Sequence, residues 1–219
     1  MQRAPVILVT GFEPFGGSPV NPSEVLVRAL AAGGSGRASV VAAVLPVVGG
    51  QEGGSARGRL DALLELHRPD ACILFGEAHV RSEVSVERVA VNLRDYRIAD
   101  NAGVVVTDAP VVPGAPDARF ATLPVHAIVD AVRAAGVPAG HSMTAGTFLC
   151  NEVMFHALDR SSGSGVPGIA GFVHLPQLES QHRIRPCDAR PITEAELLLA
   201  GRAVVDAVID AMIDRALHA

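Results

Sequence analysis

Residues 6–32 read VILVTGFEPFGGSPVNPSEVLVRALAA, an apolar run that leads through a glycine- and proline-rich loop into a helical pattern. The run Val6–Thr10 is apolar at almost every position, which is typical of a strand buried on both faces of a parallel sheet. Ser23 is expected to cap a helix that continues to Ala32. A buried strand followed by a helix is the repeating unit of α/β sheets, so this stretch predicts the fold class.

The alternation continues along the rest of the chain. Further strands are predicted at residues 39–45, 71–75, 142–145 and 168–175, and helices at residues 55–67, 127–135, 150–159 and from Thr193 onward, where Thr193 and Glu196 fit a capping box. Residues 84–101 break into short strand-like pieces that indicate a hairpin. We therefore expect a single domain over residues 1–219, in which helices cover a largely parallel central sheet.

Composition narrows the functional classes. The chain has 219 residues, a net charge of −5 and no lysine, so the positive stripe of a nucleic-acid-binding protein is missing. No segment is long and apolar enough to span a bilayer, and the first apolar run is too short for a signal peptide, which predicts a cytoplasmic protein. The three cysteines are widely spaced without a CxxC or paired His pattern, so neither a disulfide framework nor a metal site is predicted.

The loop after the first strand carries two aromatic side chains, Phe12 and Phe15, between glycines. Ligands of open α/β sheets collect at the loops that follow the carboxyl ends of strands, so the pair is a candidate wall of a binding pocket. The alternative is that both rings fold back onto the core. The loop has neither GxGxxG nor a GK[ST] ending, so it does not predict a phosphate site.

Cys150 lies where a predicted strand gives way to a helix. The positive end of the helix dipole and free N–H groups would lower the pKa of a thiol there, and the same N–H groups could bind an oxyanion. The alternative is a buried cysteine that serves as a small apolar residue. Cys72, within a strand, fits that alternative, whereas Cys187 lies in a polar loop.

His174 and Glu87 are the other two candidates. His174 ends a predicted strand, where it is either a structural residue or a catalytic base. Glu87 lies in an otherwise apolar stretch, and a carboxylate is costly to bury unless it is paired. It could therefore orient a histidine, or form a salt bridge with Arg88 or another neighbour.

Four stretches together resemble the pyroglutamyl peptidase type I (pyrrolidone carboxyl peptidase) family. They occur in the order and spacing of that family, and the likeness extends over nearly the whole chain. The matching stretches are VTGFEPFGGSPVNPS (residues 9–23), ERVAVNLRDYRIADNAG (residues 87–103), TAGTFLCNEVMFHAL (residues 144–158) and GFVHLPQL (residues 171–178).

The resemblance implies a thiol protease with a Glu87–Cys150–His174 triad, which removes an N-terminal pyroglutamyl residue from peptides without a cofactor. It also implies a three-layer α/β/α sandwich and a cytosolic homo-oligomer, a dimer or tetramer. Two family positions are polar: Asn21 would bind the lactam carbonyl, and Arg97 would lie near the oxyanion. The further substrate-binding positions that it implies are Phe12, Phe15, Glu77 (through its backbone carbonyl), Ile98, Phe148 and Leu149.

One segment departs from the family pattern. The family has a Gly-Gln-Ala-Gly-Gly-Arg type sequence after the third strand, whereas residues 76–81 read Gly-Glu-Ala-His-Val-Arg. Replacing two glycines by His79 and Val80 restricts the backbone of this loop. The change keeps open a related cysteine amidohydrolase that acts on another small acyl group. A non-catalytic pyroglutamate-binding protein is the other alternative.

Overall fold

The computed structural model describes residues 3–33 and 36–217. Its main sheet has six strands in the order β2-β1-β3-β8-β4-β7. Neighbouring strands are parallel, except that β4 runs antiparallel to β8. The bounds of these strands are β1 (Val6–Phe12), β2 (Ser39–Leu45), β3 (Ala71–Glu77), β4 (Val84–Glu87), β7 (Ala139–Ser142) and β8 (Ile169–Leu175).

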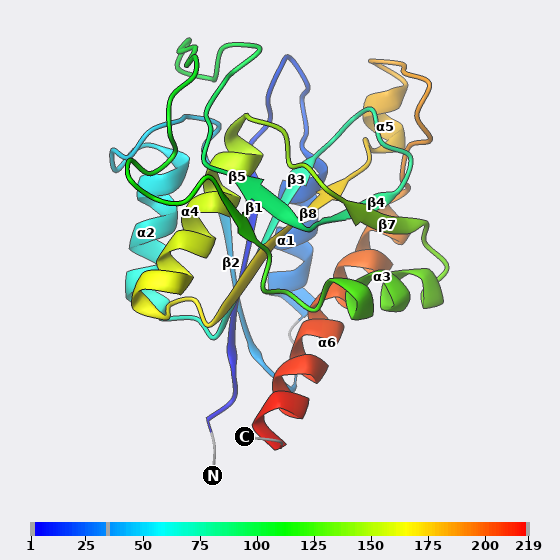
Figure 1. Cartoon of the computed structure of the whole chain (residues 1–219). Coiled ribbons are helices and arrows are strands. Elements are labelled where there is room, and N and C mark those ends of the chain that lie inside the picture. The colour runs from blue at the N-terminus through cyan, green and yellow to red at the C-terminus, as the bar shows by residue number, and fades with distance from the viewer. Residues whose placement is uncertain (1–2, 34–35, 218–219) are drawn as a thin grey trace.

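Helices cover both faces of this sheet, so the fold has three layers (Figure 1). The first layer contains α2 (Ala56–His67) and α4 (Leu149–Ser164), which pack on each other. The second contains α1 (Pro22–Gly33), α3 (Val125–Ala134) and the long α6 (Glu194–Leu217). A separate apolar core lies on each side of the sheet. The predicted α/β/α sandwich with a mixed, largely parallel sheet is confirmed.

Two predicted elements are corrected by the structure. Residues 84–101 do not form a hairpin, because β4 joins the main sheet while β5 (Val89–Val91) pairs with β6 (Ala118–Phe120). The strand predicted at residues 142–145 lies earlier, as β7, where the sequence Ala-Gly-His-Ser has no apolar run to reveal it. A short helix, α5 (Glu179–His182), was also not expected.

Side chains cap several helices, among them α2, where Ser55 Oγ accepts from the N–H of Gly58 at 3.1 Å. Asn21, not Ser23, caps α1, because its Oδ1 accepts hydrogen bonds from the backbone N–H of Ser23 (3.1 Å) and from the Ser23 hydroxyl (2.7 Å). The predicted capping box at α6 is present: Glu196 N–H donates to Thr193 Oγ1 at 3.1 Å, and Thr193 N–H donates to Glu196 Oε2 at 3.0 Å.

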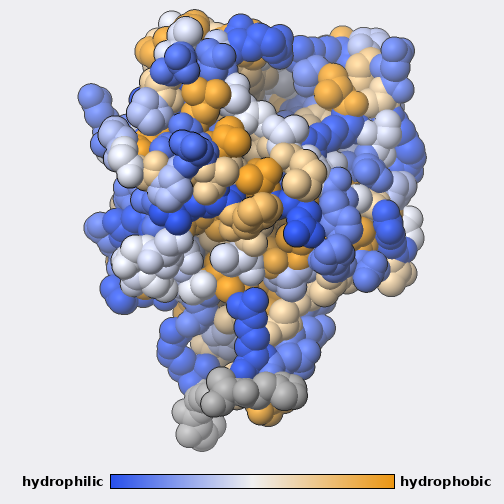
Figure 2. Space-filling model, viewed as in Figure 1, coloured by the Kyte–Doolittle hydropathy of each residue, from blue (hydrophilic) through white to orange (hydrophobic). Residues whose placement is uncertain are grey.

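The strand directions decide where a site can form. Strands β1, β3 and β8 are parallel neighbours, so their carboxyl ends meet at one edge of the sheet. Most of the face shown in Figure 2 is hydrophilic, with a band of apolar side chains across its middle. Among the residues that the structure describes, no helix combines the length and apolar character needed to cross a bilayer.

Candidate active site

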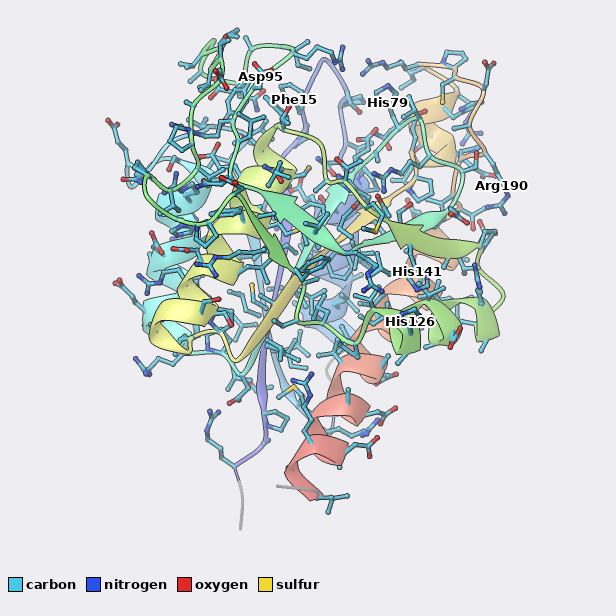
Figure 3. All side chains as sticks on the ribbon, in the orientation of Figure 1. Phe15, His79, Asp95, His126, His141 and Arg190 are labelled. Carbon is cyan, nitrogen blue, oxygen red and sulfur yellow. The ribbon has the colours of Figure 1, made fainter. Side chains whose placement is uncertain are left out.

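A cavity of about 260 Å³ opens at this edge of the sheet. Phe15 and His79, on the loops that follow β1 and β3, lie toward the same end of the molecule (Figure 3). All the predicted site residues except Glu87 line the cavity. The lining residues are Phe12, Phe15, Gly16, Asn21, Val47, Glu77, His79, Arg97, Ile98, Ala145, Phe148, Leu149, Cys150, His174 and Arg185.

Glu87 lies behind His174 rather than in the cavity. Ser85 of β4 faces His174 of β8 across the antiparallel ladder, so Glu87, two residues further along β4, lies diagonal to His174 on the same face of the sheet. Glu87 Oε1 is 2.7 Å from His174 Nδ1, and Glu87 is fully buried. Because a carboxylate only accepts, Nδ1 carries the proton and Nε2 is left as an acceptor.

Arg81 is a second partner of Glu87. Its Nη1 donates to Glu87 Oε1 at 2.6 Å, and its Nη2 donates to the carbonyl of Thr144 at 2.9 Å. Arg81 thus joins the carboxylate to the loop that leads into α4. Burial alone would favour the protonated form of Glu87, but hydrogen bonds from His174 and Ser142 and the positive charge of Arg81 together hold the pKa of this carboxyl below its usual value.

Cys150 is the second residue of α4 and faces the sheet. The space for its sulfur exists because position 76 is glycine: a Cβ there would lie 3.0 Å from Cys150 Sγ and 2.6 Å from Phe172 Cζ. Phe148 precedes the helix and makes no side-chain cap, so the N–H groups of the first turn have no side-chain acceptor there. Among the described residues, no hydrogen bond joins Cys150 Sγ to His174. In catalytic pairs this bond often tightens only when substrate binds.

The residues after Cys150 fix the opposite wall of the cavity. Asn151 is fully buried; its amide accepts from the N–H of Val91 and donates to the carbonyls of Val91 and Leu93, each at 2.9 Å. The carboxylate of Glu152 accepts a short hydrogen bond from the Tyr96 hydroxyl. Helix α4 therefore holds the segment that carries Arg97 and Ile98.

Aromatic rings form the apolar part of the cavity. Phe148 packs against Phe15, with ring centroids 5.3 Å apart, and meets Tyr96 edge-on at 4.8 Å. Phe12 ends β1 and is 3% exposed, so it belongs both to the core and to the cavity wall. Neither of the two interpretations of the Phe12–Phe15 pair is therefore complete, because the rings contact the core and also line the cavity.

Asn21 presents one polar group to this apolar space. Its Oδ1 must face the backbone N–H of Ser23, which can only donate, and its Nδ2 donates to the carbonyl of Glu13 at 3.0 Å. An amide nitrogen carries two hydrogens, and only one of them is used in the bond to Glu13. The second N–H of Asn21 is therefore available to donate to a ligand in the cavity.

A family model described as pyroglutamyl peptidase matches residues 5–213. The chain belongs to this family. Pyrrolidone-carboxylate peptidase 1 of Ralstonia nicotianae is 45% identical over 90% of this chain and 89% of its own length. The pyrrolidone-carboxylate peptidase of Pyrococcus furiosus is 45% identical over 80% and 82%, respectively. A chain from the crystal structures of that P. furiosus enzyme and its Cys-free mutant has a TM-score of 0.88 at 39% identity and covers 94% of this chain and 99% of its own.

One expectation for this pyroglutamyl peptidase family member is wrong. The helix N-terminus was expected to lower the pKa of Cys150, but burial, with the negative charges of Glu87 and Glu77, raises it to about 12. Burial also lowers the pKa of His174, more than the bond and charge of Glu87 raise it. The resting pair is therefore a neutral thiol and a neutral imidazole.

The protonation state predicts how Cys150 reacts with iodoacetamide. Only the thiolate is alkylated, and far below the pKa its fraction grows about tenfold per pH unit. We expect the inactivation rate to rise about tenfold per unit between about pH 7 and pH 9, in step with labelling of Cys150 followed by peptide mass spectrometry. The lactam 2-pyrrolidone should slow the reaction. An inactivation rate that stays constant over this range would show a preformed thiolate and contradict the neutral resting state of Cys150.

Three features of the site were missed from the sequence. They are Arg81, Gly76 and the Tyr96–Glu152 pair. Gly76 and the Tyr96–Glu152 pair act through contacts between segments far apart in the chain, and Arg81 joins Glu87, six residues away, to the distant Thr144. Cys187, which looked incidental, points its Sγ at the carbonyl of His79 at 3.1 Å and so contacts the loop that departs from the family pattern. Cys72 is fully buried in β3, as expected.

Proposed function

We propose that this chain is a cysteine peptidase that removes an N-terminal pyroglutamyl residue from peptides, with Cys150 as nucleophile, His174 as base and acid, and Glu87 as orienting carboxylate. One observation carries the proposal: Glu87 holds His174 Nδ1 at 2.7 Å, and both His174 and Cys150 open on one largely apolar cavity. The family membership points to the same reaction.

The neutral resting pair sets the order of proton transfers. As Cys150 Sγ attacks the pyroglutamyl carbonyl, His174 Nε2 takes the thiol proton, and Glu87 stabilises the imidazolium. The imidazolium then protonates the leaving amine, the C–N bond breaks and an acyl-thioester remains. Water, deprotonated by the same nitrogen, attacks the thioester and releases pyroglutamate. None of these steps requires a metal or an organic cofactor.

Two donors are proposed for the oxyanion. The backbone N–H of Cys150 belongs to the first turn of α4, and Arg97 lines the cavity. One such donor is commonly worth about 3 kcal/mol in the transition state.

The lactam fits the remaining lining. Its ring would lie among Phe12, Phe15, Phe148, Ile98 and Leu149, which are apolar and line the cavity. The spare N–H of Asn21 would donate to the ring carbonyl. The backbone carbonyl of Glu77, at the end of β3, would accept from the ring N–H.

Substrate specificity tests this proposal. A prolyl amide keeps the ring but lacks the carbonyl and carries a charge, so it would leave Asn21 unpaired and its charge desolvated. We expect kcat/KM for a prolyl amide at least ten- to a hundredfold, or about 1–3 kcal/mol, below that for the pyroglutamyl amide. Asn21→Ala should slow pyroglutamyl cleavage and so reduce the difference in kcat/KM between the pyroglutamyl and the prolyl amide.

Asn21 also caps α1, so its replacement needs a control. Asn21→Asp keeps the Ser23-facing oxygen but has no N–H to donate. It should lose pyroglutamyl cleavage, and because it also loses the bond from Nδ2 to the Glu13 carbonyl, the melting temperature of both variants is measured to separate this structural cost from the lost ligand contact. Equal kcat/KM for the two substrates in the unmutated protein would refute the lactam pocket. Faster turnover of acetyl or formyl amides would support the rival amidohydrolase, and tight binding of pyroglutamate without any turnover would support a binding protein.

Location and assembly belong to this proposal as well. We expect a cytoplasmic homo-oligomer, a dimer or tetramer, that acts on peptides and has neither nucleic acid nor membrane as partner. Exposed apolar side chains support self-association, among them Phe120 at 65% and Met143 at 63% exposed. Light scattering after gel filtration measures the mass directly, and a monomer at micromolar concentration would refute this expectation.

A further inference from the structure

The cavity carries more positive charge than a lactam requires. Arg97 and Arg185 both line it, together with His79. Pyroglutamate bound through its amide is neutral, and the tetrahedral intermediate adds one negative charge, for which Arg97 and the Cys150 N–H suffice. Arg185 has no role in the proposed reaction.

Neither of these guanidinium groups forms a salt bridge with a described carboxylate, although Glu77 lies near enough to Arg185 to feel its charge. Several other arginines form ion pairs, such as Arg81 with Glu87 at 2.6 Å and Arg119 with Asp159 at 2.5 Å. Within residues 3–33 and 36–217, Arg97 and Arg185 make no salt bridge, although both open on the cavity. A cavity wall with unpaired guanidinium groups favours an anionic ligand.

The two arginines act on the same part of the cavity. Burial and the positive charges of Arg185 and Arg97 together lower the pKa of His79, so both groups are close enough to affect this ring. Arg185 also lies beside the Phe15 loop. A Cβ added to Gly16 of that loop would be 3.7 Å from Arg185 Nη1. His79 and Phe15 lie on loops at the same end of the molecule (Figure 3).

We propose that Arg185, with the positive charge of Arg97 beside it, forms a subsite for a carboxylate carried by the leaving part of the substrate. The inference rests on the proposed peptidase function and adds a substrate preference to it. The ring side of the scissile bond is neutral, so only the leaving part can supply the anion. Its source is either the terminal carboxylate of a pyroglutamyl dipeptide, which is only two bonds beyond the scissile nitrogen, or the side chain of an aspartate or glutamate after pyroglutamate.

Glu77 opposes this preference. Among the described residues that line the cavity it is the single carboxylate; its Oε2 accepts from Gln181 Nε2 at 3.0 Å, and it feels the charge of Arg185. Its negative charge should weaken the attraction of Arg185 for a second carboxylate. The isosteric change Glu77→Gln removes this charge, and because it leaves the backbone carbonyl in place, it should strengthen the preference.

The test compares kcat/KM for pairs of substrates that differ only in one carboxylate. Pyroglutamyl-alanine against its C-terminal amide reports on the terminal carboxylate, and the amides of pyroglutamyl-aspartate and pyroglutamyl-asparagine report on the side chain. We expect at least one acidic member to be favoured about three- to tenfold at low salt, with the ratio falling as salt screens the charges.

Two variants separate this subsite from general effects on activity. Arg185→Gln should bring the favoured ratio close to one, whereas Arg183→Gln, an exposed arginine of the same segment outside the cavity, should leave it unchanged. Glu77→Gln should raise the ratio. Ratios near one in the unmutated protein, or a ratio that survives Arg185→Gln, would overturn the subsite while leaving the peptidase function intact. Failure to hydrolyse any pyroglutamyl substrate would refute both.

Discussion

Cys150→Ala is expected to abolish pyroglutamyl hydrolysis, with kcat reduced about 10⁴-fold or more, because no other group can form the acyl-thioester. The change should cost little in melting temperature and leave the binding of 2-pyrrolidone nearly unaltered, since Cys150 is half-buried at the cavity and alanine removes a single sulfur atom. Stopped or continuous assays with a pyroglutamyl amide measure the loss. Full activity of Cys150→Ala would remove the nucleophile from the account.

Cys187→Ser is the matched control for this prediction. Its hydroxyl can still donate to the His79 carbonyl, which the thiol contacts at 3.1 Å, so the loop should keep its position. We expect this variant to retain nearly full activity. Loss of activity in Cys187→Ser with retention in Cys150→Ala would exchange the roles of the two thiols.

The three proposed catalytic residues should behave as one unit. His174→Ala should reduce kcat about as strongly as Cys150→Ala, and the double variant should be hardly worse than either single one, because the second change removes a group whose partner is already lost. Single-turnover kinetics of the three variants measure this coupling. Losses that multiply in the double variant would show that Cys150 and His174 act independently.

Glu87→Gln should be milder than either change, by about one to two orders of magnitude, because it keeps the shape but loses the charge that supports the imidazolium. Arg81 adds to this effect. In the unmutated protein its guanidinium lies 2.6 Å from Glu87 Oε1, and with a neutral amide at position 87 this guanidinium would lose its counter-charge. If Glu87→Gln were fully active, the buried carboxylate would be structural only.

How far the sequence predicts the fold depends on where each strand lies. Strands β1, β3 and β8 occupy the sheet interior, so both of their faces demand apolar residues and their runs could be recognised from sequence. The edge strand β7 contains Gly140 and His141, whose side chains supply no apolar pattern. The pairing of β4 with β8 joins segments far apart in the chain, and local patterns carry no information on such pairing.

The same limit applies to the site. Residue types at strand ends pointed to His174 and Cys150, and an acid in an apolar stretch pointed to Glu87. The contact of Glu87 with His174 depends on the antiparallel placement of β4 beside β8, which fixes which side chains meet across the sheet. The high pKa of Cys150 depends on how deeply the fold buries the thiol, and the helix position alone predicted the opposite direction.

Release of chromophore from pyroglutamyl p-nitroanilide, measured side by side for the unmutated protein and Cys150→Ser, tests the central claim most directly. The account predicts steady release by the unmutated protein and a rate at least about a thousandfold lower for Cys150→Ser at equal folded concentration, because the hydroxyl is a far weaker nucleophile in a site built for a thiol. No release by the folded, unmutated protein, or equal release by both proteins, would contradict it.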